Sequence, residues 1–263
     1  MSDKNRILSV LKNIRNKEME TNAFFLPAVW NEILEDSEYV LNDNLIAAIK
    51  RENMQLDRLY YSAKNKAALN GLIKLTNMHD GIIITDILSC IPEETGAYSF
   101  FLETGAEVYS IFERREVKKN TDTMCNNDRI KFADISMTDK FYNLIISSFD
   151  KFNSYLPKYD EIRRAIEKNE IIYIGEQSIE AFAFFENTNR TTVTLRYIFV
   201  MPEARRAHYA SMLLDYGMQR GGIRYTLWVD TMNEPAKHLY GKYGYKYNGL
   251  KCMTLRIGGK RHE

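Results

Sequence analysis

The sequence predicts an α/β (α+β) protein of two similar domains, each with a mixed, largely antiparallel sheet flanked by helices. Three observations lead to this prediction. The 263 residues are 45% hydrophobic and 27% charged, an ordinary globular composition that suffices for one large domain or two of about 130 residues. The chain contains an internal repeat. Between the copies lies a polar stretch without a packing face, which is typical of a linker.

The repeat pairs segments of the first half with segments of the second. The matched blocks are 97–117 with 236–257, at an offset of 139, and 38–53 with 172–187, at an offset of 134. At the first offset Phe101 lies over Tyr240 and Gly105 lies over Gly244. The blocks 97–117 and 236–257 are each predicted as a helix, a glycine that ends it and an aromatic-rich strand. The blocks 38–53 and 172–187 are each predicted as two strands joined by a turn. Several matches in one order indicate a duplication.

Both copies have the order strand, strand, strand, helix, strand, helix, strand. Alternating apolar residues indicate the strands, and apolar residues three and four apart indicate the helices. The segments are 38–53, 55–63, 64–76, 81–88 and 97–117 in the first copy, and 172–187, 192–200, 207–217, 224–231 and 236–257 in the second. The first copy opens with an amphipathic helix at 5–17, and the second with a strand at 130–135 and helices at 139–152 and 159–169. We therefore expect domains at 1–120 and 130–263, with a linker at 121–129.

Charge and cysteine content exclude several classes of function. The formal net charge is +1, so no basic field argues for nucleic acid. Cys90, Cys125 and Cys252 have no metal-ligand spacing, and three is an odd number for a disulfide framework. With no signal pattern and no apolar run near 18 residues, we expect a cytoplasmic protein without a membrane partner or a metal. Cys252 lies in a strand pattern and is expected to be a buried small apolar residue.

The segment 195–217 combines a strand, a basic turn and a helix. The strand ends at Met201 and Pro202, and the helix starts near Ala207. The N-terminus of a helix exposes unpaired N–H groups and the positive end of the helix dipole, which suits a pyrophosphate. Arg205 and Arg206 add positive charge at the same place. A solvated arginine pair before an amphipathic helix is the alternative interpretation of this segment alone.

The segment 233–245 is predicted as a capped helix. Asn233 is a favourable N-cap, and Glu234 and Pro235 suit the first helical turn. Gly244 is expected to end the helix in the left-handed conformation, with a strand after it. These local preferences do not explain why the helix carries a tyrosine at position 240.

The two segments together resemble the GNAT superfamily of acyl-coenzyme-A-dependent N-acyltransferases. Val-x-Pro followed by Gln/Arg-x-x-Gly-x-Gly/Ala, the family's pyrophosphate loop, is matched by Val200, Pro202, Arg205 and Ala210. Asn-x-x-Ala-x-x-Leu-Tyr-x-x-x-Gly-Phe/Tyr is matched by Asn233, Ala236, Leu239, Tyr240, Gly244 and Tyr245. The resemblance covers residues 129 to 257, and the second motif is fairly specific.

The resemblance implies acetyl-CoA as acyl donor and direct transfer to an amine, without an acyl-enzyme. Tyr240 would be the general acid that protonates the departing thiolate. The coenzyme-binding residues implied by the two motifs are Ile198, Phe199, Val200, Arg205, Arg206, Ala207, His208, Tyr209, Ala210, Ser211, Asn233, Ala236 and Tyr240. His208 departs from the family because it stands where the loop has a glycine. Either only its backbone N–H is used, or its imidazole reaches the phosphates.

The first copy lacks these features. Glu94 and Phe101 stand at the positions of Asn233 and Tyr240, and residues 64–76 have no Arg-x-x-Gly-x-Gly/Ala spacing. Residues 1–120 therefore resemble a degenerate GNAT-like domain. Two alternatives remain: a non-catalytic acyl-CoA-binding or regulatory protein, and an aminoacyl-tRNA-dependent transferase of similar tandem fold. The acceptor and the oligomeric state, a homodimer included, stay open. The candidate general bases are Glu186, Asp230, Glu176 and Tyr173.

Overall fold

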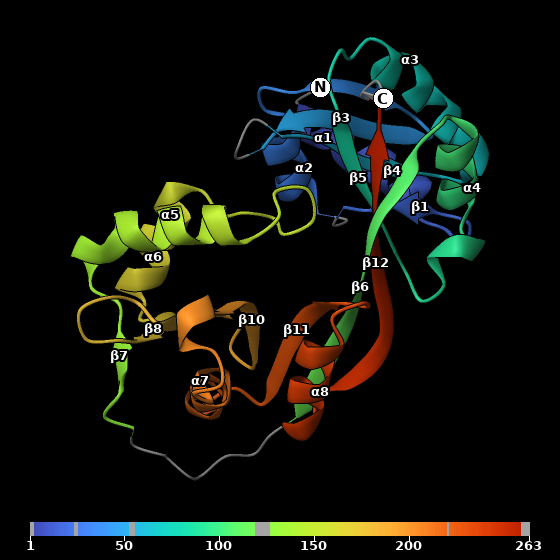
Figure 1. Cartoon of the computed structure of the whole chain (residues 1–263). Coiled ribbons are helices and arrows are strands. Elements are labelled where there is room, and N and C mark those ends of the chain that lie inside the picture. Colours follow the sequence, from blue (N-terminus) through green and yellow to red (C-terminus); the bar gives the residue numbers. More distant parts are fainter. Residues whose placement is uncertain (1–2, 24–25, 53–55, 119–126, 220, 259–263) are drawn as a thin grey trace. The chain divides into compact units, whose positions relative to one another are not determined.

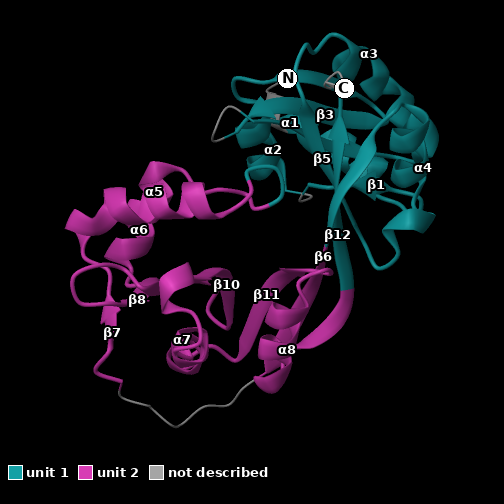
Figure 2. Ribbon diagram, in the orientation of Figure 1, with its two compact units in different colours: residues 1–111, 151–153, 250–263 teal, residues 112–150, 154–249 magenta. Residues whose placement is uncertain are grey.

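The structure is a computed structural model that describes residues 3–23, 26–52, 56–118, 127–219 and 221–258 (Figure 1). The chain divides into two compact units (Figure 2). Unit 1 comprises residues 1–111, 151–153 and 250–263, and unit 2 comprises residues 112–150 and 154–249. Each unit is a mixed α/β structure with a mostly antiparallel sheet, as the sequence predicted.

Unit 1 is built on a sheet with the strand order β2-β3-β4-β5-β12, and β1 also pairs with β4. Its elements are α1 (Asp3–Ile14), β1 (Glu20–Thr21), α2 (Pro27–Leu34), β2 (Glu38–Asn42), β3 (Leu45–Arg51), β4 (Asp57–Ala63), the 3₁₀ helix η2 (Lys66–Asn70), α3 (Gly71–Asn77), β5 (Ile83–Ser89), η3 (Pro92–Glu94) and α4 (Gly96–Glu103). The amphipathic helix expected at 5–17 is α1, while α2 has no counterpart in the prediction.

The sheet of unit 1 is buried on both faces. Along β3, Leu45, Ala47 and Ile49 belong to the core that contains α3 and α4 residues. Ile46 and Ala48 belong to the core under α1 and α2. Because successive side chains of a strand point to opposite faces, a continuous apolar run such as β3 can fill two cores. Helices on both faces therefore follow from this composition.

Unit 2 has the strand order β6-β11-β10-β9-β8-β7. Its elements are β7 (Ile130–Phe132), η4 (Ile135–Met137), α5 (Thr138–Ser148), α6 (Tyr159–Glu167), β8 (Ile171–Ile174), β9 (Ala181–Asn187), β10 (Thr192–Val200), η5 (Pro202–Ala204), α7 (Tyr209–Gly217), β11 (Arg224–Asp230) and α8 (Glu234–Lys242). β10 and β11 are parallel, and the other pairs are antiparallel.

Two apolar cores cover the two faces of the unit 2 sheet. One contains residues of α7 and α8, including Leu213, Leu214 and Tyr240. The other contains residues of α5 and α6, including Phe141 and Ile162. In Figure 1, α7 and the pair α5 and α6 accordingly lie on different sides of β8 and β10. We name these the α7/α8 face and the α5/α6 face.

Two long strands take part in both units. β6 (Glu107–Lys118) begins in unit 1, and its residues 112–118 pair with β11 in unit 2. β12 (Lys246–Ile257) begins in unit 2, and its residues 251–257 pair with β5 in unit 1. The last strand of each repeat thus completes the sheet of the other unit. The division expected from the repeats, 1–120 and 130–263, follows the order of the sequence. The two units instead follow the strand pairings, so β6 and β12 each contribute residues to both units.

Residues 151–153 also belong to unit 1, although they lie between α5 and α6 in the sequence. Within unit 1, Arg58 Nη2 donates a hydrogen bond to the Phe152 carbonyl at 3.0 Å. The expected linker, 121–129, falls mostly outside the described residues, which resume at 127.

Candidate functional site

The backbone feature that defines the candidate site is the separation of β10 from β11. The parallel pairing runs from Thr192–Arg224 to Leu195–Leu227 and goes no further among the described residues. β10 nevertheless continues to Val200, with its other edge paired to β9 throughout. The register with β9 shifts between Leu195 and Tyr197, and such a bulge bends and twists a strand. The outer edge of residues 198–200 therefore has backbone groups that no described strand occupies.

The predicted coenzyme residues of β10 line this open edge. Ile198 and Val200 pack against the core of the α7/α8 face. Phe199 packs against the core of the α5/α6 face and lies 6.0 Å from the ring of Phe149. A ligand that added itself to the β10 edge would be bounded by apolar side chains on both faces.

The predicted phosphate loop leads directly from this edge to the start of α7. Arg205, Arg206, Ala207 and His208 are all exposed. Arg205 and Arg206 form no ion pair with any described carboxylate. Two arginines without a counter-charge beside a helix N-terminus favour an anionic ligand.

His208 is the N-cap residue of α7 and adopts the left-handed conformation, with φ of 59°. Its carbonyl accepts the first helical hydrogen bond, from the Met212 N–H at 3.1 Å, and its side chain makes no capping bond. Glycine favours this conformation because it has no Cβ, and histidine is one of the side chains that tolerate it. The backbone therefore explains a glycine at this place and how a histidine can replace it.

The first turn of α7 carries the remaining predicted loop residues, Tyr209, Ala210 and Ser211. The N–H groups of a first helical turn have no partner within the helix. The Tyr209 hydroxyl donates to Glu180 Oε2 at 2.9 Å, and this bond raises the pKa of Tyr209 above its ordinary value. Glu180 thus contacts the side chain of the first residue of α7, a contact that the sequence patterns did not indicate.

The helix α8 has the cap and the stop that the sequence predicted. Asn233 Oδ1 accepts a hydrogen bond from the Ala236 N–H at 3.1 Å, and Gly244 has φ of 80°. The Tyr243 hydroxyl donates to the Ser211 carbonyl at 3.0 Å, which ties the end of α8 to the first turn of α7. Asn233 itself is exposed.

Tyr240 lies on the inner side of α8 and is 6% exposed. Its ring meets that of Tyr245 edge-on, with 5.9 Å between centroids. Burial raises the pKa of Tyr240 to about 12, so the hydroxyl keeps its proton at neutral pH. That hydroxyl has no hydrogen-bond partner among the described residues. Tyr240 can therefore donate to a ligand without breaking an existing bond.

The structure brings some of the predicted coenzyme-binding residues together and places the others elsewhere. The residues that share the core of the α7/α8 face are Ile198, Val200, Tyr209, Ala236 and Tyr240. The exposed loop residues and Asn233 lie outside that core, and Phe199 belongs to the opposite face. The part that converges combines the open β10 edge, the start of α7 and the phenol of α8.

The four candidate general bases occupy different places. Glu186 lies on β9, 3.9 Å from Arg196. Glu176 forms an ion pair with Lys131 at 3.0 Å, and Asp230 accepts a hydrogen bond from the Met232 N–H at 2.8 Å. Tyr173 packs its ring against Phe141. Of the four, Glu186 is the carboxylate beside the bulge of β10.

The sequence patterns missed Arg196, the residue inside the bulge. Its guanidinium lies over the rings of Phe184 and Tyr197, at 5.3 and 5.6 Å from their centroids, and 3.8 Å from Glu161. The Tyr197 hydroxyl donates to the carbonyls of Ser154 and Tyr155, both at 2.9 Å. Burial raises the pKa of Tyr197 to about 12. Arg196 follows Thr192 and Thr194 in the polar phase of the strand's alternation, so the sequence pattern contained no signal for this bulge.

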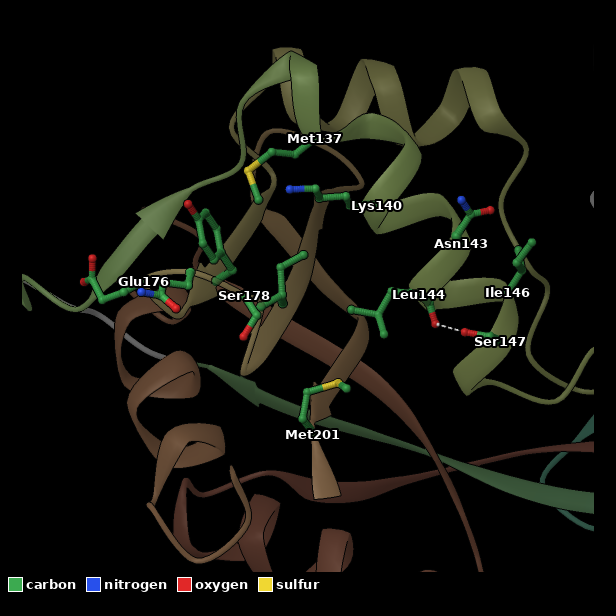
Figure 3. A pocket seen from close by; sticks show the side chains of 12 residues that line it. Met137, Lys140, Asn143, Leu144, Ile146, Ser147, Glu176, Ser178 and Met201 are labelled. Carbon is green, nitrogen blue, oxygen red and sulfur yellow. Dashed lines mark hydrogen bonds between the residues drawn. The ribbon is translucent and has the colours of Figure 1, made fainter. Parts of the chain in front are cut away.

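A groove of about 950 Å³ lies on the α5/α6 face of unit 2 (Figure 3). One wall is α5, and the other is the turn between β8 and β9 together with Met201. Its lining residues are Met137, Lys140, Asn143, Leu144, Ile146, Ser147, Tyr173, Glu176, Gln177, Ser178, Ile179 and Met201. Because Met201 directly follows the open edge of β10, the groove starts where that edge ends. Two of the candidate bases, Tyr173 and Glu176, belong to it.

The corresponding edge in unit 1 is occupied. β4 and β5 are parallel, and within the described residues they pair at Asp57–Ile83 and Arg58–Ile84 and no further along β4. Because β3 pairs with one edge of β4 over its whole length, β1 must lie on the same edge as β5. β1 pairs there through Glu20–Ala63 and Thr21–Ser62.

Asn22 continues this contact beyond β1. Its Nδ2 donates to the Leu59 carbonyl at 2.9 Å and to Thr85 Oγ1 at 3.1 Å, so it bridges β4 and β5. Its Oδ1 accepts from the Tyr61 N–H at 2.8 Å. Glu20 Oε1 accepts from the Gly96 N–H, 2.7 Å away, at the start of α4. A segment of the chain therefore fills the place in unit 1 that stays open in unit 2.

The described residues contain no group of three or more His, Cys, Asp or Glu side chains that could hold a metal ion. No helix within the described ranges is both long and apolar enough to cross a membrane. Cys252 is half-buried, and burial raises the pKa of its thiol well above the ordinary value.

Comparison with known proteins agrees with this geometry. Residues 166–247 match the family model of the acetyltransferase (GNAT) domain. No curated protein sequence matches the chain significantly. The matched residues contain the open edge of β10, the start of α7 and Tyr240, so the second half of the chain carries a GNAT domain.

Solved structures of the same fold extend over most of the chain. A GCN5-related N-acetyltransferase from Sphaerobacter thermophilus is 12% identical with a TM-score of 0.59, covering 97% of this chain and 90% of that one. One from Kribbella flavida is 13% identical with a TM-score of 0.58, covering 88% and 93%. A tandem GNAT protein from the clavulanic acid biosynthesis pathway is 8% identical with a TM-score of 0.57, covering 98% and 97%. The fold of the whole chain is therefore that of tandem GNAT proteins.

Proposed function

We propose that this chain is an acyl-CoA-dependent N-acyltransferase that transfers acetyl from acetyl-CoA to a primary amine of a small molecule or peptide. Unit 2 would carry the site, and unit 1 would not bind the coenzyme. The observation that carries the proposal is the open edge of β10, which leads at one end to the unpaired N–H groups of α7 and is bounded on one face by the core that contains the Tyr240 phenol.

The residues of unit 2 fit each part of the donor. The first turn of α7, with Arg205 and Arg206, would hold the pyrophosphate. The backbone of residues 198–200 would take the pantetheine arm as an added strand and polarise the acyl oxygen. In unit 1 the same edge is already paired with β1, which supports a single site per chain.

Transfer in this site would be direct. The nitrogen of a neutral amine attacks the thioester carbonyl, a C–N bond forms and the C–S bond breaks. Tyr240 gives its hydroxyl proton to the departing sulfur and recovers a proton from water. Because the pKa of Tyr240 is about 12, and that of a free thiol is about 8.5, hydrogen bonding would stabilise the sulfur before full proton transfer. The amine releases its proton to water or to a carboxylate such as Glu186.

Binding and turnover test the proposal separately. Calorimetry on the full chain should give one acetyl-CoA site, and thiol release with an amine library should reveal turnover. The double variant Arg205→Glu, Arg206→Glu should weaken binding at least about 10-fold, because it reverses two charges at the phosphates. Arg190→Glu, an exposed arginine in the turn between β9 and β10, is the matched control. Two sites per chain, or no binding, would contradict the proposal.

A further inference from the structure

The groove on the α5/α6 face has a chemical character of its own. Met137, Leu144, Ile146, Ile179 and Met201 give it an apolar lining, and its volume of about 950 Å³ is in the range of small-molecule sites. In Figure 3, Lys140 points into the groove, and Leu144 and Met201 face each other across it. An elongated ligand with an apolar body fits this surface.

The groove holds one cation that lacks a counter-charge. Among the described residues, the Lys140 ammonium forms no ion pair with a carboxylate and no hydrogen bond with another group. The carboxylate of the groove, Glu176, is already paired with Lys131 at 3.0 Å. The uncompensated charge of the groove is therefore positive, and an anionic group on the ligand is its complement.

The position of the groove connects it with the transfer site. Met201 belongs to the groove and directly follows the β10 edge along which the acyl donor would lie. Lys140 and Leu144, the residue that faces Met201 in Figure 3, lie on the same helix four residues apart, which corresponds to roughly 6 Å along its axis. A ligand anchored at Lys140 must span about that length before it reaches Met201.

We propose that the groove between α5 and the β8–β9 turn binds the acceptor, and that the acceptor is an amine with an apolar body and a carboxylate that pairs with Lys140. This inference rests on the proposed acetyl transfer, because it concerns the second substrate of the same site. The distance along α5 favours acceptors whose amine and carboxylate are well separated over α-amino acids, in which the two groups are adjacent.

Pairs of amines with and without a carboxylate test the inference. We expect 8-aminooctanoate to be acetylated with a higher kcat/KM than octylamine, and glycine to be a poor acceptor. Lys140→Ala should raise KM for 8-aminooctanoate about 10-fold or more, the change expected for a lost charge-assisted hydrogen bond. KM for octylamine should stay unchanged. Lys140→Arg should restore the preference, and Lys168→Ala, an exposed lysine outside the groove, should alter neither acceptor.

A second variant tests whether the acceptor binds in the groove, independently of the charge of Lys140. Ser147 is exposed on α5 and lines the groove, so Ser147→Trp should fill it and raise KM for both amines while acetyl-CoA affinity is unchanged. A chain that neither binds acetyl-CoA nor acetylates any amine would overturn the proposed function and this inference together. If the chain acetylates both amines equally well, and neither Lys140→Ala nor Ser147→Trp changes KM for either amine, only the inference is overturned.

Discussion

β4 of unit 1 and β10 of unit 2 are corresponding strands with different neighbours. Both are fully paired on one edge, and both separate from a parallel strand on the other. In unit 1, β1 and Asn22 occupy the resulting opening, whereas no described strand enters it in unit 2. The two repeats therefore share the separation of strands, and what fills the opening distinguishes them.

The two units also differ in the helices α4 and α8, which occupy corresponding positions in the two repeats. Phe101 of α4 is 1% exposed, and its ring meets that of Tyr61 at 5.5 Å. Tyr240 of α8 has the corresponding position but carries a hydroxyl. The α4 cap is Thr95, whose side chain accepts from the Tyr98 N–H, one residue after the position at which the repeat placed Glu94. In unit 1 a phenylalanine packed in the core therefore stands where unit 2 has the Tyr240 phenol.

The largest expected effect comes from giving unit 2 the residue of unit 1. Tyr240→Phe should lower kcat about 10- to 1000-fold with little change in acetyl-CoA affinity, since water can partly replace the acid. The measurement is thiol release under conditions in which chemistry is rate-limiting. Because the pKa of Tyr240 is about 12, loss of its proton should not limit the wild-type rate below pH 10.

Tyr245→Phe is the matched control for this variant. The Tyr245 hydroxyl is buried without a hydrogen-bond partner among the described residues, so its removal should leave kcat unchanged and increase stability by up to about 1 kcal/mol. Equal rates for Tyr240→Phe and the wild type would remove Tyr240 from the mechanism.

The closed opening of unit 1 can be tested through stability. Asn22→Ala removes the bridge between Leu59 and Thr85 and leaves the Tyr61 N–H without its side-chain acceptor. We expect the free energy of unfolding in urea to fall by about 1–3 kcal/mol. Asn13→Ala, on the exposed side of α1, should cost less than about 1 kcal/mol. Equal losses for both variants would show that Asn22 does not hold the opening shut.

His208→Gly tests the left-handed start of α7. Glycine should stabilise the protein by about 0.5–1 kcal/mol, because it adopts φ near 59° without steric cost. His238→Gly within α8 should have the opposite sign, with a loss of about 0.5–1 kcal/mol. Acetyl-CoA affinity should change by less than about 1 kcal/mol in His208→Gly. A loss of acetyl-CoA affinity of about 10-fold or more in His208→Gly would instead show that the imidazole contacts a phosphate.

The smallest expected effect concerns the carboxylate at the start of α7. Glu180→Gln removes a negative charge beside the proposed phosphate site while an amide can still accept from the Tyr209 hydroxyl. Acetyl-CoA affinity should rise about 2- to 5-fold at low salt and less at high salt. Glu180→Asp keeps the charge and should show no gain in calorimetry. A fall in affinity for Glu180→Gln would mean that the carboxylate supports the loop.

Local features of this protein were determined by the sequence. The Asn233 cap, the glycine stops at Gly105 and Gly244 and most of the strands and helices are where the patterns predict them. Each depends on a few neighbouring residues, through cap hydrogen bonds, left-handed φ and the period of apolar side chains. The motif that includes Tyr240 is of the same kind, because a single helix carries most of it.

Only the tertiary structure decided which strand edges are paired. The patterns place a strand at the end of 97–117 and at the end of 236–257. They do not show that each strand also takes part in the other unit, because either strand alternates suitably for either sheet. The insertion of residues 20–22 beside β4 depends on an edge formed by residues more than 35 positions away in the sequence. The same is true of Arg196 against Glu161, of Glu180 at the start of α7 and of the groove around Lys140. Such sites join side chains that are distant along the chain, and the period of an isolated segment contains no information about its partner.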